Sequence, residues 1–376
     1  MNKVRFWEAT ATLVGGIIGA GILGLPYALS HLGFFGGGFL LLILGLSEMS
    51  VNLMFAEIIL RTKYRHQIVG YTEKYLGKWA KYFEIIAMTA GSYGVLVVYI
   101  IGEGVILSAL LGGDRYFYSL IFLTVGAFIL YFGVNTIKVF ELWMVVFFIT
   151  IILAILGISH GYINIENYNG FDITGLPAAY GVILFAYGGT AAVATLRQVL
   201  KDNEKYIEKA VIIGTMIPII IYVLFTFVII GVMGKSITEI ATVGLGLKFG
   251  VYMIVLGNLF AFFTMGTGFL SAGNILRSMF MFDFKISKIY SWLLAILVPL
   301  LLFVWGVRGF IDTLSIVGGV TTGLTSIIII LNHRQAIKKG DRVPEFAFPK
   351  IRILRIALIA VFILGFVFTI FNVLFK

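Results

Sequence analysis

The residues from Ala9 to Ser47 form a run of 39 positions without a charged side chain. A membrane-spanning helix needs about 20 apolar residues, so this run is long enough for two crossings. The middle of the first crossing, from Gly19 to Pro26, reads Gly-Ala-Gly-Ile-Leu-Gly-Leu-Pro. Glycine weakens a helix and proline removes an amide donor. Unpaired backbone in hydrocarbon costs several kcal/mol per group, so a break at this depth is tolerated only where it lines a cavity or is buried in protein. The run therefore predicts a membrane helix interrupted at a binding site.

The composition of the whole chain supports a membrane protein. Of 376 residues, 60% are hydrophobic and 12% are charged, and the mean hydropathy is +1.04. Soluble domains have about 45 to 50% apolar and about 25% charged residues. The absence of cysteine excludes disulfides, cysteine-based metal sites and thiol catalysis. We predict an all-α polytopic membrane protein with no soluble domain and no resident cofactor.

Apolar stretches of about 18 or more residues predict eleven transmembrane spans. These spans lie near residues 7–31, 34–60, 79–111, 115–134, 139–160, 176–197, 210–233, 249–276, 289–307, 310–332 and 354–375.

The positive charges are unevenly distributed between the two sides of this arrangement. With the N-terminus in the cytoplasm, 23 of the 28 lysines and arginines fall on the cytoplasmic side. The positive-inside rule then fixes the orientation. We predict a multi-pass protein of the plasma (inner) membrane, with the N-terminus cytoplasmic and the C-terminus outside. This placement assigns the net charge of +10 to membrane orientation and not to a nucleic-acid partner.

The sixth span contains a second break, from Phe185 to Thr190, which reads Phe-Ala-Tyr-Gly-Gly-Thr. Two consecutive units of five spans enter the membrane from opposite sides, which gives an inverted repeat. We therefore predict a first repeat of spans one to five (1–160) and a second repeat of spans six to ten (161–335). A cytoplasmic linker and span eleven (336–376) follow.

Several segments resemble a known group of transporters. The sequence Gly-Ala-Gly-Ile-Leu at Gly19–Leu23 resembles the Gly-Ser-Gly-Ile-Phe type signature of the amino acid, polyamine and organocation (APC) superfamily. The longer string Gly15–Ala28 is similar to the amino acid/auxin permease and tryptophan/tyrosine permease branches, as are Tyr71–Lys78 and Phe260–Phe269. The resemblance implies a five-plus-five inverted-repeat (LeuT-like) transporter fold with broken helices 1 and 6 and one additional helix. It also implies amino acid transport.

The two breaks predict a binding site for a zwitterion. Free amides beside the positive end of a half-helix bind a carboxylate, and free carbonyls of the other break accept from an ammonium. Neither break contains a charged side chain, which favours a substrate with a neutral side chain. The candidate substrate-binding residues are Gly19, Ala20, Gly21, Ile22, Tyr93, Phe185, Ala186, Tyr187, Gly188 and Gly189, with Tyr99 as the alternative to Tyr93. We expect Gly21→Val to place its side chain at the carboxylate position.

Two other interpretations of the span-one glycines remain weaker. The spacing also matches a Gly-x-Gly-x-x-Gly dinucleotide motif, but no strand or βαβ unit precedes or surrounds it. Gly15-x-x-x-Gly19 is also typical of close helix packing. Packing alone does not explain Pro26.

The coupling cation is either a proton or sodium. Sodium-driven relatives of this fold imply a site formed by the carbonyls of Gly15, Ile18 and Ala261 with the Thr264 hydroxyl. Met265 occupies the position of the second hydroxyl, and Thr267 or Ser271 from a neighbouring turn is a candidate replacement. Glu48 and Glu103 are candidate proton carriers, because carboxyls within a membrane are costly and by default functional.

Other polar residues of the spans receive structural interpretations. Glu57 is predicted to form an ion pair with Arg61 at the membrane boundary. The four histidines are predicted at helix ends or in loops, without metal-ligand spacing.

Together these patterns predict a secondary active transporter that imports a neutral amino acid, with aromatic ones among the candidates, on a proton or sodium gradient by alternating access. The alternatives are an amino acid exchanger or an ion channel. An enzyme is not predicted, because no nucleophile–base pair or metal cluster is visible. The expected partners are the amino acid, the coupling cation and the lipid bilayer, and the sequence makes no prediction of oligomeric state.

Overall fold

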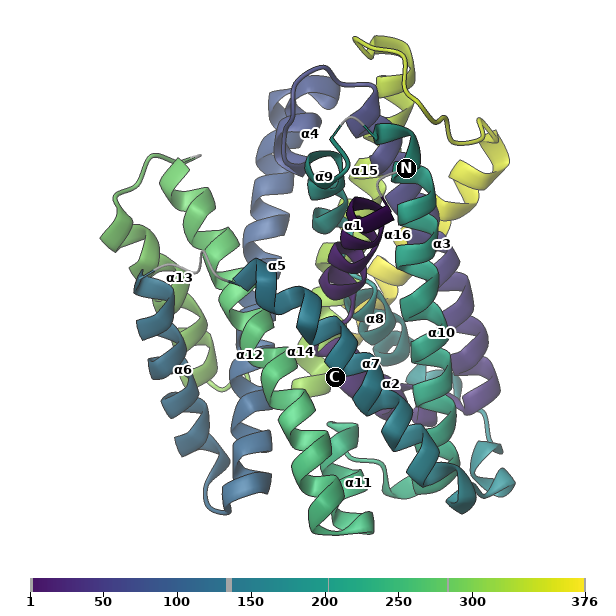
Figure 1. Cartoon of the computed structure of the whole chain (residues 1–376), viewed down its shortest axis with the longest axis vertical. Helices are drawn as coiled ribbons and strands as arrows, with labels where there is room; N and C mark the ends of the chain where they lie inside the picture. The colour runs from purple at the N-terminus through teal and green to yellow at the C-terminus, as the bar shows by residue number, and fades with distance from the viewer. Residues whose placement is uncertain (1–2, 133–136, 202, 283, 375–376) are drawn as a thin grey trace.

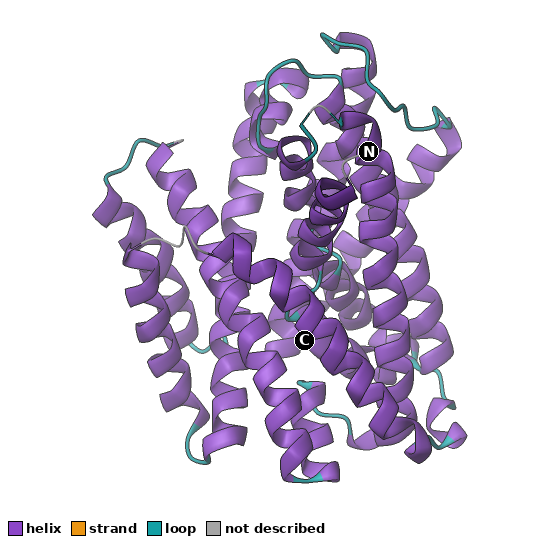
Figure 2. Ribbon diagram, in the orientation of Figure 1, coloured by secondary structure: helices purple, strands orange, loops and turns teal. Residues whose placement is uncertain are grey.

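The computed structural model describes residues 3–132, 137–201, 203–282 and 284–374. These residues form helices, turns and loops without a strand (Figures 1 and 2). The α-helices are α1 (Lys3–Ile17), α2 (Gly21–Leu32), α3 (Phe34–Leu60), α4 (Ile68–Leu76), α5 (Lys78–Leu111), α6 (Arg115–Phe132), α7 (Ile137–Ser159), α8 (Leu176–Ala186), α9 (Thr190–Val199), α10 (Ile207–Met233), α11 (Ala241–Phe249), α12 (Val251–Phe282), α13 (Lys288–Val304), α14 (Phe310–Ile316), α15 (Gly323–Lys339) and α16 (Arg352–Leu374).

The helices confirm a multi-pass, all-α membrane protein. Within the described ranges, eight helical stretches are long and apolar enough to cross a membrane, and there are nine if the bent pair α1 and α2 counts as one span. Two further apolar segments, Ile149–Tyr162 at the end of α7 and Lys288–Val304, have 10–17 residues among those searched. Each of the eleven predicted stretches contains helix, but the exact count of spans stays a prediction.

Most of the helices form two groups that differ in their packing partners. Helices α5, α6, α12 and α13 pack against one another, with α6 and α13 at the left edge of Figure 1. Helices α1, α2, α3, α8, α9 and α10 form the second group. Helix α7 contacts α1, α10 and α12, and α14 contacts α5 and α8, so these two helices connect the groups.

Two interruptions lie inside the second group. Helix α1 ends at Ile17 and α2 begins at Gly21, and the two helices meet at an angle of 53°. Helix α8 ends at Ala186 and α9 begins at Thr190. We call residues 18–20 the first break and residues 187–189 the second break. Pro26 lies inside α2, so the glycines and not the proline mark the first break.

The two halves of the chain share a local pattern beyond the breaks. Helix α4 has 9 residues and is followed by Gly77, which has a φ of 94°. The 34-residue α5 begins at the next residue. Helix α11 also has 9 residues and is followed by Gly250, which has a φ of 85°. The 32-residue α12 begins at the next residue. Positive φ favours glycine, since it has no Cβ to clash. Each half therefore contains a short helix, a glycine turn and a long helix in the same order.

A π-helical segment, Val317–Thr322, joins α14 to α15. It contacts α5, α8 and α16. π-Helical turns are rare and occur frequently at functional sites. The sequence contains Gly318 and Gly319 here, and neither glycine predicts the extra residue per turn.

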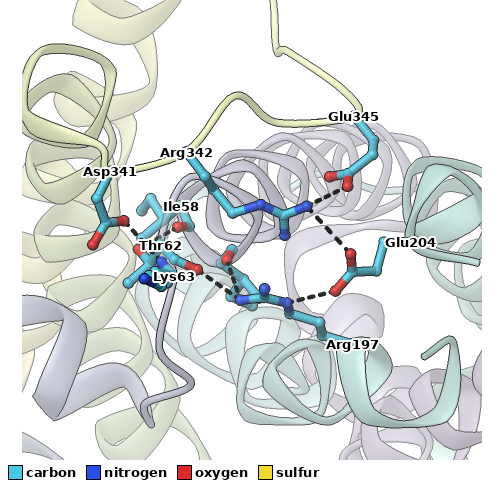
Figure 3. A network of polar contacts seen from close by, with 9 residues as sticks. Ile58, Thr62, Lys63, Arg197, Glu204, Asp341, Arg342 and Glu345 are labelled. Atoms are coloured by element: carbon cyan, nitrogen blue, oxygen red, sulfur yellow. Dashed lines mark hydrogen bonds and ion pairs between the residues drawn. The ribbon is translucent and has the colours of Figure 1, made fainter. Parts of the chain in front are cut away.

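A polar network connects loops at one end of the molecule (Figure 3). The Arg197 guanidinium donates to the carbonyls of Ile59 and Thr62 at 3.1 and 2.7 Å, and pairs with Glu204 at 2.7 Å. Arg342 contacts Glu204 at 3.3 Å and also pairs with Glu345. The α15–α16 linker, the end of α3 and the α9–α10 loop are therefore held together by charge-assisted hydrogen bonds.

Candidate functional site

The two breaks lie directly against each other. A Cβ atom on Gly21 would approach the Cβ of Ala186 to 2.7 Å, and a Cβ on Gly189 would lie 3.1 Å from the carbonyl oxygen of Gly16. A Cβ on Gly16 would likewise approach that of Ala192 to 2.7 Å. Glycine is thus required for this close approach of α1 and α2 to α8 and α9. The structure brings the two predicted halves of the substrate site together.

The first break presents amide groups without helical partners. Among the described residues, no backbone acceptor engages the amides of Gly19, Ala20 and Gly21, whereas the Ile22 amide donates to Gly19 O at 3.4 Å. The N-cap Ala20 makes no side-chain hydrogen bond. The N-terminus of a helix binds anions through such amides and through its positive dipole end. The amides assigned to the carboxylate from sequence are therefore present, although that of Ile22 is already used.

The carbonyls of the second break are more occupied than the sequence suggests. The Phe185 carbonyl accepts from the Gly188 amide at 3.1 Å. The Ala186 carbonyl accepts from the Tyr222 hydroxyl at 2.9 Å, and the same hydroxyl lies 3.0 Å from the Ile17 carbonyl. Sequence reasoning missed Tyr222, which is fully buried on α10 and belongs to no motif. Its hydroxyl contacts the last carbonyl of α1 and that of α8.

We expect Tyr222→Phe to weaken transport by about tenfold, because carbonyls at both breaks lose a buried hydrogen bond worth about 1 to 3 kcal/mol when unsatisfied. The phenyl ring would keep the packing against Tyr187, whose ring centroid lies 5.3 Å away. Initial uptake rates in proteoliposomes measure this effect. Phe225→Leu on the same helix is the control for a general packing change, and equal losses in both variants would contradict a specific role for the hydroxyl.

The tyrosines are placed differently from the prediction. The Tyr187 ring points away from the first break, since its hydroxyl lies 2.8 Å from the position of a Cβ on Gly45 of α3. On α5 it is Tyr99, not Tyr93, whose hydroxyl lies at the first break, 3.6 Å from a Cβ position on Gly19. Tyr93 is half-buried and lies about 9 Å further along the helix axis, on a different face. Tyr99 therefore replaces Tyr93 as the candidate.

The predicted sodium ligands lie on elements with largely different packing partners, and the site stays a prediction. Gly15 lies near the end of α1, which packs against α7, α9 and α10, and Ile18 belongs to the first break. Ala261 and Thr264 lie on α12, which packs mainly against α5, α11, α13 and α7. The Thr264 hydroxyl donates to the Phe260 carbonyl at 2.7 Å.

The two remaining positions of the sodium template are also occupied within the protein. The Thr267 hydroxyl donates to the Phe263 carbonyl at 2.7 Å. Met265 is fully buried, and its Cε lies 2.9 Å from a Cβ position on Gly102 of α5. A thioether packed against α5 thus stands where the template has a second hydroxyl.

Of the residues whose side chains the structure describes, four carboxyls are fully buried. Glu48 accepts from the Ser326 hydroxyl at 2.9 Å. Glu103 has no hydrogen-bond partner among the side chains that the structure describes, and its Oε1 lies 3.6 Å from a Cβ position on Gly266. Glu84, which the sequence analysis missed, accepts from Thr325 at 3.0 Å. Glu84 lies one turn after Lys81, and a charged pair at this place in the sequence is typical of an ordinary span boundary.

The fourth carboxyl, Glu57, has a richer environment than a boundary ion pair. It contacts Arg61 at 2.6 Å, as predicted, and also His333 at 2.6 Å and the Phe348 amide at 2.7 Å. His333 is fully buried within α15. The prediction that all histidines lie at helix ends or in loops is therefore wrong for His333. In the part of the chain that the structure describes, no group of three His, Asp or Glu residues could hold a metal ion.

Comparison with known proteins agrees with this architecture. The sequence model of the tryptophan/tyrosine permease family matches residues 2–372. The chain belongs to the tryptophan/tyrosine permease family. This finding confirms the resemblance to the APC superfamily and selects one of the two branches. Because its relatives are permeases and transporters, the family also agrees with the prediction that the chain is not an enzyme.

Two curated relatives of this permease family member are the tyrosine-specific transport system 1 of Haemophilus influenzae and the low affinity tryptophan permease of Proteus vulgaris. Each is 26% identical, over 234 and 242 residues that cover 60% and 59% of this chain. The matches span 57% and 56% of the relatives' own lengths.

A solved structure, MhsT in complex with L-phenylalanine, superposes with a TM-score of 0.64 at 15% identity, covering 96% of this chain and 98% of MhsT. The chain therefore shares the fold of this neighbour.

Proposed function

We propose that the chain is a secondary active transporter that imports a neutral aromatic amino acid by alternating access, coupled to a proton or sodium gradient. The observation that carries the proposal is the set of free amides at Gly19, Ala20 and Gly21, directly beside the second break. Family membership supports an amino acid as the substrate of these amides.

Each part of a zwitterion has a place in this arrangement. The carboxylate binds the three amides at the positive end of α2. The Tyr99 hydroxyl, next to Gly19, is a further donor to the carboxylate. The ammonium binds carbonyls of the second break, among which Gly188 is solvent-exposed. Since no charged side chain lies in either break, the side chain of the substrate is neutral.

The aromatic character of the substrate rests on the relatives. The curated relatives are named for tyrosine and tryptophan, and MhsT was solved with phenylalanine.

The proposed membrane arrangement has eleven spans, which requires that α7 and α13 also cross. The repeats are 1–160 and 161–335, and the equal patterns of α4 with α5 and α11 with α12 support them. The linker and the last span are 336–376. We propose the plasma (inner) membrane and a cytoplasmic N-terminus from the positive-inside rule. The C-terminal Lys376, placed outside, lies beyond the described residues.

Uptake into proteoliposomes tests the proposal. Each of the twenty amino acids is offered under a pH gradient and, separately, under a sodium gradient. We expect concentrative uptake of tyrosine, tryptophan or phenylalanine under one gradient, and inhibition by the other two. A requirement for amino acid inside the vesicle would instead favour an exchanger. Ohmic current without saturation in a planar bilayer would favour a channel.

A further inference from the structure

Helix α15 carries two pairs of adjacent polar residues, Thr325–Ser326 and Asn332–His333, seven positions apart. Seven residues are about two turns of an α-helix, so equivalent members of the pairs lie on one face. Ser326 and His333 face α3, since they contact Glu48 at 2.9 Å and Glu57 at 2.6 Å. The α3–α15 interface thus contains two polar contacts, about 10 Å apart along α15.

The partners of Thr325 and Asn332 lie on other helices. Thr325 donates to Glu84 of α5 at 3.0 Å, and Asn332 donates to Thr72 of α4 at 2.9 Å. These contacts face away from α3. Among the described contacts of α15, the face with Ser326 and His333 is the one that joins two carboxyls of the same neighbouring helix.

Asn52 lies between those two carboxyls along the sequence of α3. It lies one turn after Glu48 on α3, hence on the same face, and is fully buried. Within the described residues, neither amide atom of Asn52 has a hydrogen-bond partner, and the same holds for Oε2 of Glu48 and Nδ1 of His333. Buried polar atoms are almost always hydrogen-bonded to protein or to ordered water. Four buried atoms without protein partners along one interface therefore indicate internal water.

We propose that the α3–α15 interface is a proton route, in which water held by Asn52 joins Glu48 in the membrane interior to the Glu57–His333 pair near the end of α3. The inference rests on the proposed transport function and names the proton as its coupling ion. Transfer along the route breaks one O–H or N–H bond and forms another at each member. No other reactant is needed.

The two ends of the route differ in their charge environment. In the described part of the chain, no cationic side chain pairs with Glu48, and an unpaired carboxylate is costly in the membrane interior. Glu57 is stabilised as a carboxylate by Arg61 and by the Phe348 amide. Glu48 is thus suited to carry the proton, and the Glu57–His333 pair to exchange it with the cytoplasmic side.

Neighbouring helices add few titratable or charged groups to this interface. Among the described residues these are Tyr180 of α8, next to Glu48, Glu84 of α5, behind Thr325, Arg197 of α9, at the end of α3, and Tyr187, whose hydroxyl lies against Gly45 of α3. None of the four forms a hydrogen bond with Asn52.

The test compares two transport modes of the full-length protein in proteoliposomes. Counterflow exchanges labelled for unlabelled amino acid without a gradient, and accumulation is driven by a pH gradient while an internal pH dye reports proton entry. We expect Glu48→Gln to keep counterflow within about twofold of wild type and to lose both accumulation and proton entry. Asn52→Leu should slow both amino acid accumulation and proton entry by about tenfold, which is the effect of losing one buried polar contact. The matched control is Glu239→Gln, an exposed residue between α10 and α11.

Full pH-driven accumulation by Glu48→Gln or Asn52→Leu would overturn the route. Accumulation by the wild type under a sodium gradient alone would overturn it as well. If Glu48→Gln misfolds and loses counterflow, Ser326→Ala tests the proton route instead. This variant removes only the hydroxyl that donates to Glu48. The route is overturned if this variant couples protons like the wild type. A wild-type protein that transports no amino acid in either mode refutes the proposed function itself, which is a distinct outcome.

Discussion

Replacement of Gly19 by valine is expected to abolish amino acid uptake while the protein still folds. A Cβ at Gly19 meets only the Tyr99 hydroxyl, at an ordinary distance of 3.6 Å. Valine would extend from there into the space in front of the free amides. Loss of two charge-assisted hydrogen bonds to a carboxylate, each worth about 1.5 to 3 kcal/mol, reduces affinity by at least about 100-fold. Gly19→Ala should have a smaller effect.

Gly21→Val serves as the contrast and corrects the expectation drawn from sequence. A Cβ at Gly21 lies 2.7 Å from the Cβ of Ala186, so a side chain there enters α8 and not the carboxylate position. We expect this variant to disturb helix packing and to unfold at lower temperature. Uptake of labelled tyrosine and thermal unfolding in detergent separate the two effects. Normal uptake by folded Gly19→Val protein would refute the carboxylate site.

Arg197→Met is expected to destabilise the protein by about 3 to 5 kcal/mol, the usual effect of removing one partner of a buried ion pair. The Arg197 side chain is 9% exposed and its partner Glu204 is 21% exposed. The substitution would leave the carbonyls of Ile59 and Thr62 without their donor. Methionine keeps much of the apolar stem, so the loss reports the charge and the hydrogen bonds.

Chemical denaturation in detergent measures this loss. Arg197→Lys should fall between methionine and wild type, because lysine retains the charge but not the planar fork of donors. Arg65→Met, at an exposed loop position, is the matched control and should change stability by less than about 0.5 kcal/mol. Equal stability of Arg197→Met and wild type would show that the network in Figure 3 adds nothing to the fold.

The sequence predicts the helices well, because charge-free runs mark membrane helices and depend only on local composition. Helix boundaries at Ile17 and Ala186 lie close to glycines, which weaken a helix. Glycine alone does not end a helix, since Gly15 and Gly16 lie inside α1. The family resemblance rests on the same local strings.

Contacts between distant helices were harder to predict. Tyr222, His333 and Glu84 meet partners that are 36 to 276 residues away in the sequence. Which face of a helix meets which neighbour depends on its rotation and register in the folded molecule. Tyr99 and Tyr93 illustrate this limit, since both lie on α5 and only the orientation of the helix distinguishes them. The π-helical segment has no sequence signal of its own.

The glycine contacts of α8 bear on which parts of the protein can move separately. A Cβ on Gly181 would collide with the Ser315 backbone of α14, and one on Gly318 with the Gly181 carbonyl and the Phe185 amide. Because backbones this close resist sliding past each other, we expect α8, the end of α14 and the segment Val317–Thr322 to move together. Helix α9 instead packs on α1 and α3. We therefore expect any relative movement of the two pieces of the sixth apolar stretch to occur at residues 187–189.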